Sequence, residues 1–393
     1  MINNFMNNTL KPLGIYIHIP FCVRKCVYCD FLSFPSCDQM EKNEEVYKDY
    51  THSLCLEIAQ KCEMASQSGY YANTVYIGGG TPSVLPLNLI AEITDRLDKS
   101  IDLGKVKEFT IECNPKTADL DKFRGYKALG INRISMGVQS FDDEALKLLG
   151  RIHTSKEAIE SYELARKAGF ENINLDLMSS LPGQSTQKYE ESLKLMTSLE
   201  PEHISSYSLI VEENTPLANN LEAYPPLVSE EEDRLQYALT EEILKLNNYS
   251  RYEISNYSRP GYESIHNSSY WTRVPYLGLG LGASSFYEGR RFHNTEKLNL
   301  YLTEEGAAYQ PCDEEIVEKK DAMAEFMFLG LRLLKGIAAE DFEKEFGTDI
   351  LQVYGDVLKD HIKNGVITHE NGRYKLTSYG IDVSNMVFSD YIL

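Results

Sequence analysis

Three cysteines lie within eight residues near the start of the chain, and their spacing suits a metal cluster. Cys22, Cys26 and Cys29 form the pattern C-x3-C-x2-C, whereas the rest of the 8 cysteines are scattered. Clustered thiols of this kind are more typical of metal ligands than of a disulfide framework. The β-branched, apolar segment 14–19 before them predicts a buried strand. The cysteines are therefore expected in the loop that follows a strand.

Three thiolates would leave one iron of a [4Fe–4S] cluster without a protein ligand, because such a cluster normally takes four cysteines. A molecule with an amino and a carboxylate group could occupy that open position. The alternative is a zinc site or a group of buried thiols. Zinc takes four ligands, usually from paired cysteine elements, and the nearest further candidate, His18, should point away from the loop in an alternating strand. The spacing favours the iron–sulfur cluster.

The first half of the chain alternates short β-branched runs with amphipathic stretches, which predicts an α/β fold with a parallel sheet. Predicted strands lie at 14–19, 75–77, 108–112, 132–138, 172–178 and 203–210. Gly130 and Gly169 each precede one of these strands and are placed to end a helix in the left-handed region. Six such units predict an incomplete (β/α)6 barrel. Active sites of parallel barrels form at the carboxyl ends of the strands, where the cysteine loop is expected.

Two further regions follow the predicted barrel. The first begins with the capping box Ser229-x-x-Glu232, then loses periodicity, and contains His266-Asn267-x-x-Tyr270-Trp271. The second predicts helices at about 314–334, 339–346 and 350–363 and then a hairpin, which together are typical of a winged-helix domain. We expect three domains: a barrel over 1–228, a connecting region over 229–312, and a winged-helix-like C-terminal domain over 313–393.

The charge balance excludes some classes of partner. Lys+Arg total 39 against 59 for Asp+Glu, a net charge of −20, and nucleic acids or anionic membranes favour a basic surface instead. The apolar stretches fall short of the ~20 residues that a membrane span needs. The first twelve residues, MINNFMNNTLKP, lack the basic and apolar regions of a secretory signal. A cytoplasmic protein without a transmembrane segment is expected.

The segment from Tyr16 to Phe31, YIHIPFCVRKCVYCDF, resembles the opening of radical S-adenosylmethionine (SAM) enzymes. Its Tyr-x-His-x-Pro-Phe-Cys prefix is similar to the family of oxygen-independent coproporphyrinogen III oxidases and the related heme chaperones of the HemW branch. The resemblance implies a [4Fe–4S] cluster on the three cysteines and SAM at its open iron. It also implies an electron from flavodoxin or ferredoxin, which would cleave the SAM sulfonium.

The same resemblance implies a set of SAM-binding residues. Gly78-Gly79-Gly80-Thr81-Pro82 follows a predicted strand, where glycines let the backbone approach a ligand closely. Other matching positions lie in or near the cysteine motif or at the ends of later strands. The predicted cofactor-binding residues are Tyr16, Tyr28, Gly79, Gly80, Thr81, Glu112, Gln139, Arg151, Asp176 and Ile210. For any one of these polar residues, a salt bridge at the cavity rim is the alternative.

Three features separate the two branches of the family. Oxidases carry one more cysteine two residues after the motif, where this chain has Phe31, and a longer N-terminal segment than the 21 residues before Cys22. His266-Asn267-x-x-Tyr270-Trp271 matches a motif that marks the heme chaperones. We predict a heme chaperone that delivers heme to hemoproteins, with His266 as the hypothetical axial ligand, since neutral histidine commonly binds iron. The alternatives are an oxygen-independent coproporphyrinogen III oxidase, or a scaffold that binds SAM without cleaving it.

Overall fold

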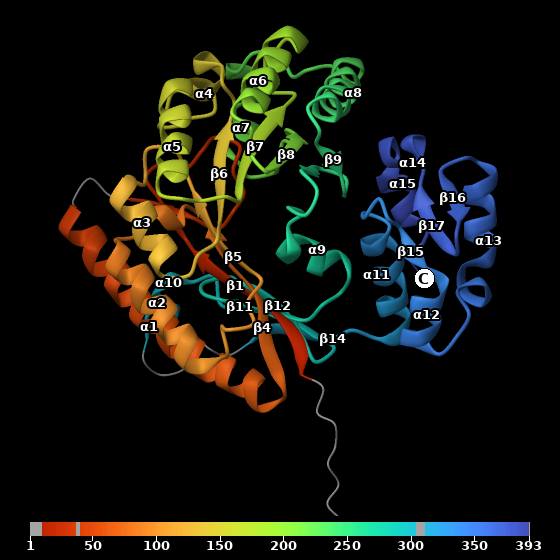
Figure 1. Cartoon of the computed structure of the whole chain (residues 1–393), viewed down its shortest axis with the longest axis horizontal. Coiled ribbons are helices and arrows are strands. Elements are labelled where there is room, and N and C mark those ends of the chain that lie inside the picture. The colour runs from red at the N-terminus through yellow and green to blue at the C-terminus, as the bar shows by residue number, and fades with distance from the viewer. Residues whose placement is uncertain (1–9, 37–39, 304–310, 393) are drawn as a thin grey trace, which may run out of the picture.

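The computed structural model describes residues 10–36, 40–303 and 311–392. Residues 1–9, which carry part of the prediction about a secretory signal, lie outside the described residues, as does Cys37. Figure 1 shows a partial barrel with helices on its outer face and a separate C-terminal group of elements beside it.

Six neighbouring parallel strands build the barrel and confirm the predicted (β/α)6 arrangement. They are β1 (Lys11–Ile19), β4 (Tyr70–Gly79), β5 (Glu108–Cys113), β6 (Arg133–Gln139), β7 (Ile173–Ser179) and β8 (His203–Ser208). The helices between them are α1 (Met40–Gln67), α2 (Leu87–Ser100), α3 (Leu120–Ala128), α4 (Asp143–Leu148), α5 (Ser155–Lys167) and α6 (Thr186–Ser198). Gly130 and Gly169 have φ angles of 87° and 92°, as predicted for left-handed helix ends.

The weakly periodic region extends this sheet on both sides. On the β8 side lie β10 (Asn256–Ser258) and β9 (Ser250–Arg251), and on the β1 side lie β11 (Tyr276–Leu279), β12 (Ser284–Tyr287), β13 (Arg290–His293) and β14 (Cys312–Ile316). The helical elements here are α7 (Pro216–Asn219), the 3-10 helix η2 (Leu221–Ala223), α8 (Glu230–Leu246), α9 (Ile265–Trp271) and α10 (Leu298–Tyr301). The predicted helix at 314–334 is wrong at its start, because residues 312–316 pair with β13 as a strand.

The C-terminal elements have the predicted order of helices and then a hairpin, around an apolar core of their own. They are α11 (Lys319–Gly330), β15 (Ile337–Ala338), α12 (Ala339–Phe346), α13 (Ile350–Lys363), β16 (Ile367–Glu370), β17 (Arg373–Leu376), α14 (Ser378–Asp382) and α15 (Ser384–Ser389). The three strands pair in the order β15-β17-β16. In Figure 1 this blue group lies beside the barrel, with α9 between them, and α9 contacts both β4 and α11.

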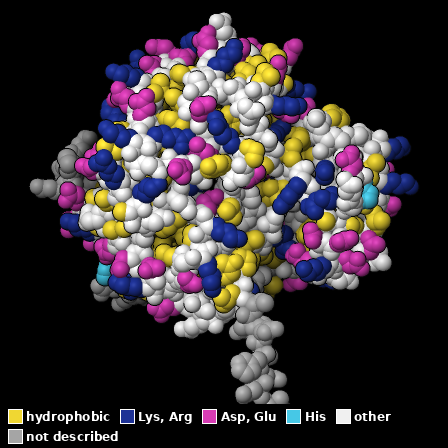
Figure 2. Space-filling view, viewed as in Figure 1, with side chains coloured by type: hydrophobic (Ala, Val, Ile, Leu, Met, Phe, Trp, Pro, Cys, Tyr) yellow, Lys and Arg dark blue, Asp and Glu magenta, His cyan; other side chains and the backbone are white. Residues whose placement is uncertain are grey.

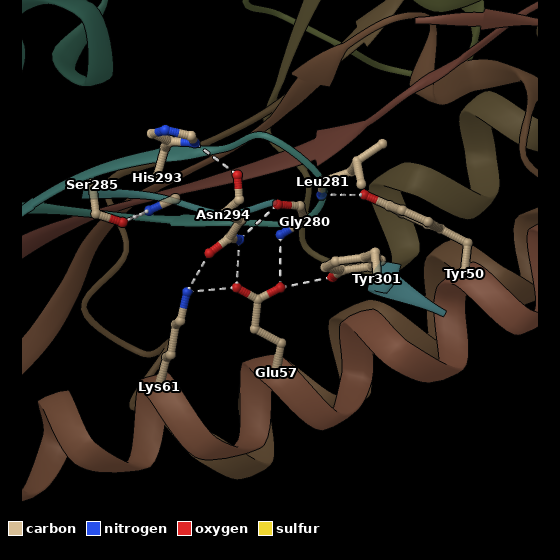
Figure 3. Close-up of polar contacts among 10 residues, drawn as sticks. Tyr50, Glu57, Lys61, Gly280, Leu281, Ser285, His293, Asn294 and Tyr301 are labelled. Atoms are coloured by element: carbon tan, nitrogen blue, oxygen red, sulfur yellow. Dashed lines mark hydrogen bonds and ion pairs between the residues drawn. The ribbon is translucent and has the colours of Figure 1, made fainter. Parts of the chain in front are cut away.

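A buried polar network ties α1 to the strand extension (Figure 3). The Glu57 carboxylate is fully buried and accepts hydrogen bonds from Lys61 Nζ at 2.7 Å, Gly280 N at 2.9 Å and Tyr301 OH at 2.7 Å. Asn294 Nδ2 donates a fourth at 2.7 Å. A buried carboxylate is tolerated when its oxygens are bonded and its charge is paired. This network holds α1 against the turn after β11.

Acidic and basic side chains are mixed over the face shown in Figure 2, so the net negative charge forms no single acidic block there. Within the described ranges, no helix is long and apolar enough to cross a bilayer.

Candidate cofactor site

The cysteine loop is fixed at both ends by backbone pairing. Cys22 ends the short strand β2 (Phe21–Cys22), which pairs with β3 (Phe34–Pro35) after the loop. Ser36 N donates to Cys22 O at 2.7 Å, and Val27 N, within the loop, donates to Leu149 O at 3.1 Å. The loop is therefore held between β1, which precedes it, and α4.

The three cysteine side chains line one cavity of about 540 Å³ at the carboxyl ends of the strands. Thr81 Oγ1 donates to Cys22 Sγ at 3.5 Å, and Arg151 Nη1 donates to Cys26 Sγ at 3.4 Å. Among the described residues, no three His, Cys, Asp or Glu side chains are grouped to hold a single metal ion.

Burial disfavours the thiolate form of two of the three cysteines. It raises the pKa of Cys22, and it raises the pKa of Cys29 to about 11. Because iron binds the thiolate, cluster assembly at these residues must release protons.

Most of the predicted cofactor-binding residues share this cavity. Its lining includes Tyr28, Gly79, Gly80, Thr81, Glu112, Gln139, Arg151, Asp176 and Ile210 together with the three cysteines. Tyr16 is not part of the lining; its hydroxyl pairs with His18 Nδ1 at 2.9 Å, behind the cysteine loop. His266 is not part of it either. A cavity of this size is within the usual range for small-molecule sites.

The glycine-rich segment after β4 joins the cysteine loop through its backbone. Gly80 N donates to Ile19 O at 2.9 Å, and Thr81 N donates to Phe21 O at 2.7 Å. A Cβ atom on Gly80 would lie 2.7 Å from Phe21 O, so a side chain there would separate the two segments. Glycine is needed because the two backbones approach so closely.

Glu112 lies at the end of β5 and is held by two donors. Tyr76 OH donates to its Oε1 at 2.7 Å, and Gly79 N donates to its Oε2 at 3.1 Å. Burial raises the pKa of Glu112 to about 7, although the Tyr76 hydrogen bond opposes this shift. The two hydrogen bonds fix the position of the carboxyl group, and its raised pKa means that it changes charge near neutral pH.

Arg151 links the cysteine loop to β6. Besides Cys26, its guanidinium donates to Asn114 Oδ1 at 2.7 Å and to Gly137 O. Its Nε and the Gln139 Oε1 are buried without a hydrogen-bond partner among the described residues. Unsatisfied polar atoms on a cavity wall fit a polar ligand that completes their bonding. The donor set therefore fits a cluster with a polar cofactor.

His266 lies in the short helix α9, which is anchored on β5. The Glu108 carboxylate accepts hydrogen bonds from Ser264 Oγ at 3.1 Å and Ile265 N at 2.7 Å at the start of this helix. The His266 ring is 1% exposed and lies between Thr74 Oγ1, 2.8 Å from Nδ1, and Tyr270 OH, 2.8 Å from Nε2. Burial lowers its pKa to about 3, so the ring is neutral.

The other residues of this motif face in different directions. Asn267 lines the cavity, whereas the Trp271 ring lies 4.2 Å from the Arg332 guanidinium of the C-terminal domain. The His266 ring stacks on Tyr76, with centroids 5.0 Å apart. Since Tyr76 bonds Glu112, α9 connects the cavity wall to the C-terminal domain.

Several residues that line the cavity are not predicted from the sequence. They are Tyr76, Arg133, Asn174, Tyr207 and Asn256. Arg133 carries a detectable signal, since a charged residue at the start of an apolar strand is unusual. The others come from segments that the fold alone brings together.

Comparison with known proteins supports the same assignment. The sequence profile of the radical SAM superfamily matches residues 16–196, and that of the HemN C-terminal domain matches residues 317–383. A heme chaperone HemW of Lactococcus lactis is 35% identical over 384 residues, 98% of each chain. The HemW of Escherichia coli is 34% identical, covering 94% of this chain and 96% of its own. The chain belongs to the HemW family of radical SAM proteins.

Radical SAM proteins carry a [4Fe–4S] cluster and SAM, which agrees with the three thiols on one cavity. The fold also matches coproporphyrinogen III oxidase (HemN) from Escherichia coli, with a TM-score of 0.84 over 98% of this chain and 90% of that one. At 21% identity, this likeness shows the shared fold alone.

Proposed function

We propose that this chain is a heme chaperone that binds a SAM-ligated [4Fe–4S] cluster and heme, and delivers heme to hemoproteins. The observation that carries the proposal is the nearly full-length similarity to curated heme chaperones, 35% identical in the first of them. The cavity supports the cluster and SAM, because three thiols and a set of polar side chains share it.

The roles proposed for the cavity residues follow from their chemistry. Cys22, Cys26 and Cys29 hold the cluster, and Arg151 supports the Cys26 thiolate through its hydrogen bond. Glu112 and Asp176 accept hydrogen bonds from the hydroxyl and amino groups of SAM, and Gly79 and Gly80 let the backbone approach it. When bound, the cluster and SAM supply one-electron chemistry, while the protein supplies orientation and exclusion of solvent.

The identity of the heme ligand stays a prediction. The surroundings of His266 show which contacts would have to break before this residue could bind iron. Both ring nitrogens are engaged, by Thr74 and Tyr270, and the ring is 1% exposed. Iron could reach Nε2 only after the Tyr270 hydrogen bond breaks and α9 moves away from Tyr76. Heme binding through His266 therefore requires a rearrangement of α9.

We further propose that a flavodoxin or ferredoxin reduces the cluster and that the protein works in the cytoplasm. Arg24 and Lys25 lie beside the cysteines on the cavity lining, and Arg24 is exposed. Two cations beside the cluster, in a chain of net charge −20, would attract an acidic electron carrier to this face. An open iron site also favours a reducing compartment.

The domain boundaries at 228 and 312 remain our proposal. The C-terminal apolar core, whose buried residues run from Ala322 to Tyr391, supports the last boundary. Because β14 extends to Ile316, the chain leaves the barrel sheet a few residues after that boundary.

The second candidate is an oxygen-independent coproporphyrinogen III oxidase, because this chain shares the fold of HemN and the C-terminal domain named after it. Anaerobically reconstituted protein tests both on one sample, by heme titration and by coproporphyrinogen turnover with SAM and a reductant. We expect stoichiometric heme uptake and no protoporphyrinogen. Measurable protoporphyrinogen would overturn the chaperone assignment, and absence of heme uptake would remove its basis.

A further inference from the structure

Arg133 lies on the wall of the same cavity, at the end away from the cysteines. It begins β6, and alternate residues of that strand, Arg133, Ser135, Gly137 and Gln139, line the cavity. Side chains alternate along a strand, so Arg133, Ser135 and Gly137 face the same side, and Gln139 reaches the cavity after a bulge. Arg133 is 1% exposed and is among the largest fully buried side chains. A permanent positive charge is therefore enclosed in the barrel.

No hydrogen bond or ion pair joins the Arg133 guanidinium to another residue in the described ranges, and its Nε is buried without a partner. Arg151, the other guanidinium on this wall, has three acceptors: Cys26, Asn114 and Gly137. A guanidinium carries five N–H donors, and a buried charge without partners is costly. The contrast between the two arginines indicates that a ligand outside the chain accepts the hydrogen bonds of the Arg133 guanidinium.

Two carboxyl groups, those of Glu112 and Asp176, interact electrostatically with Arg133, but both accept their hydrogen bonds from other residues. Glu112 accepts from Tyr76 and Gly79, and Asp176 accepts from Asn174 Nδ2 at 2.6 Å. Arg133 lowers the pKa of both carboxyls, but burial outweighs it and leaves both pKa values raised. The two carboxyl groups therefore interact favourably with the Arg133 charge at longer range, without a hydrogen bond or ion pair to it.

Arg133 is too far along the strand to serve the cluster end. Arg133 and Gln139 are the first and last residues of β6, and because of a bulge after Gly137 their backbones are separated by about five strand rises of about 3.3 Å, or about 16 Å. An arginine side chain spans only part of that distance. A carboxylate that sits on the open iron beside the cysteines is therefore not the partner of Arg133.

We propose that Arg133 binds the carboxylate of a second small ligand at the end of the cavity away from the cysteines. A planar guanidinium binds a carboxylate through two parallel hydrogen bonds, which is its strongest arrangement. Asn256 Oδ1, also on the lining and buried without a partner, offers an acceptor to a donor group of the same ligand. The carboxylate can come from a free amino acid or from a tetrapyrrole propionate.

The test uses cluster-reconstituted, SAM-saturated full-length protein and two pairs of probes that differ only in their acid groups. L-methionine is compared with methioninamide, and hemin with hemin dimethyl ester, by calorimetry and absorbance. We expect Arg133→Gln to weaken binding of at least one acid about tenfold, with the matching amide or ester unchanged. Arg133→Lys keeps the positive charge but lacks the planar guanidinium, so its affinity for the acid should lie between those of wild type and Arg133→Gln. Arg124→Gln, at an exposed position, serves as the control.

The outcomes separate this proposal from the chaperone function. If Arg133→Gln and wild type bind both acids equally, or if neither acid binds wild type better than its neutral counterpart, the proposal is overturned. If hemin fails to bind wild type while methionine binding depends on Arg133, the chaperone function fails and the Arg133 site stands. Ligand-free Arg133→Gln should melt at or above the wild-type temperature, since it loses an unpaired buried charge. If this variant does not fold, Arg133→Lys decides on the same probes.

Discussion

The cysteine loop and helix α9 both carry candidate iron ligands, but they present them in opposite ways. The cysteine thiols line an open cavity, where Thr81 and Arg151 donate hydrogen bonds to the sulfurs of Cys22 and Cys26. Deprotonation of the thiols would strengthen these bonds. The His266 ring is enclosed, with both nitrogens bonded. A ligand-type residue in a loop is ready for a metal, whereas the same kind of residue locked in a helix first has to lose its partners.

Removing the thiols should have the largest effect. Cys22→Ala, Cys26→Ala or Cys29→Ala should each reduce the iron of anaerobically reconstituted protein from about four atoms per chain to nearly none. Iron and sulfide analysis with EPR measures this. Cys312→Ala, a half-buried cysteine of β14, is the control and should retain the cluster. A full cluster in a variant with all three cysteines replaced by alanine would show that the loop is not its binding site.

His266→Ala tests whether the enclosed ring serves stability, heme binding or both. Loss of two buried hydrogen bonds and of the stacking on Tyr76 should lower the free energy of unfolding by about 2–3 kcal/mol. Denaturant unfolding measures this loss, and heme titration is followed on the same sample. A changed Soret band with lost affinity would support His266 as the heme ligand. An unchanged band together with the lower stability would assign the ring to packing alone.

The pH dependence of SAM binding should report Glu112. Burial raises the pKa of Glu112 to about 7, above the ordinary value for glutamate. Its contribution to folding stability is therefore present at acidic pH and is lost as the pH rises through about 7. The ionised carboxylate accepts hydrogen bonds from SAM better, so affinity should rise about tenfold from pH 6 to pH 8. Calorimetry should show this slope in wild type. A slope that persisted in Glu112→Gln would assign it to another group.

Tyr76→Phe should give the smallest effect, because it removes one hydrogen bond to Glu112 and keeps the ring under His266. SAM affinity should fall about fivefold, equivalent to about 1 kcal/mol. Tyr126→Phe is the matched control, since the Tyr126 hydroxyl is buried without a partner in the described part of the chain. Equal affinities in the two variants would mean that Tyr76 does not position Glu112.

The sequence predicts the parts of the fold that follow local rules. The six barrel strands repeat one β-branched pattern, and the capping box predicted at Ser229 forms. The cysteine spacing predicts a shared cavity because the residues are close in sequence. Whether they hold a cluster, and which residues hold SAM, stay predictions.

The remaining parts depend on distant pairing. Strands β9 to β13 have only two to four residues, too few to show a period of two. Glu314 and Glu315 suit a helix, but pairing with β13 makes them part of a strand. The isolation of Arg133 could not be predicted, because its lack of an acidic partner depends on side chains from other strands.

The Glu57 network has a consequence for the order of assembly during translation. Glu57 is separated by 237 residues from Asn294 and by 244 from Tyr301, which complete its hydrogen bonds. Because a nascent chain emerges from its N-terminus, this acid leaves the ribosome long before its partners exist. The contact between α1 and the strand extension can therefore form only after the segment that contains Asn294 and Tyr301 has been synthesised.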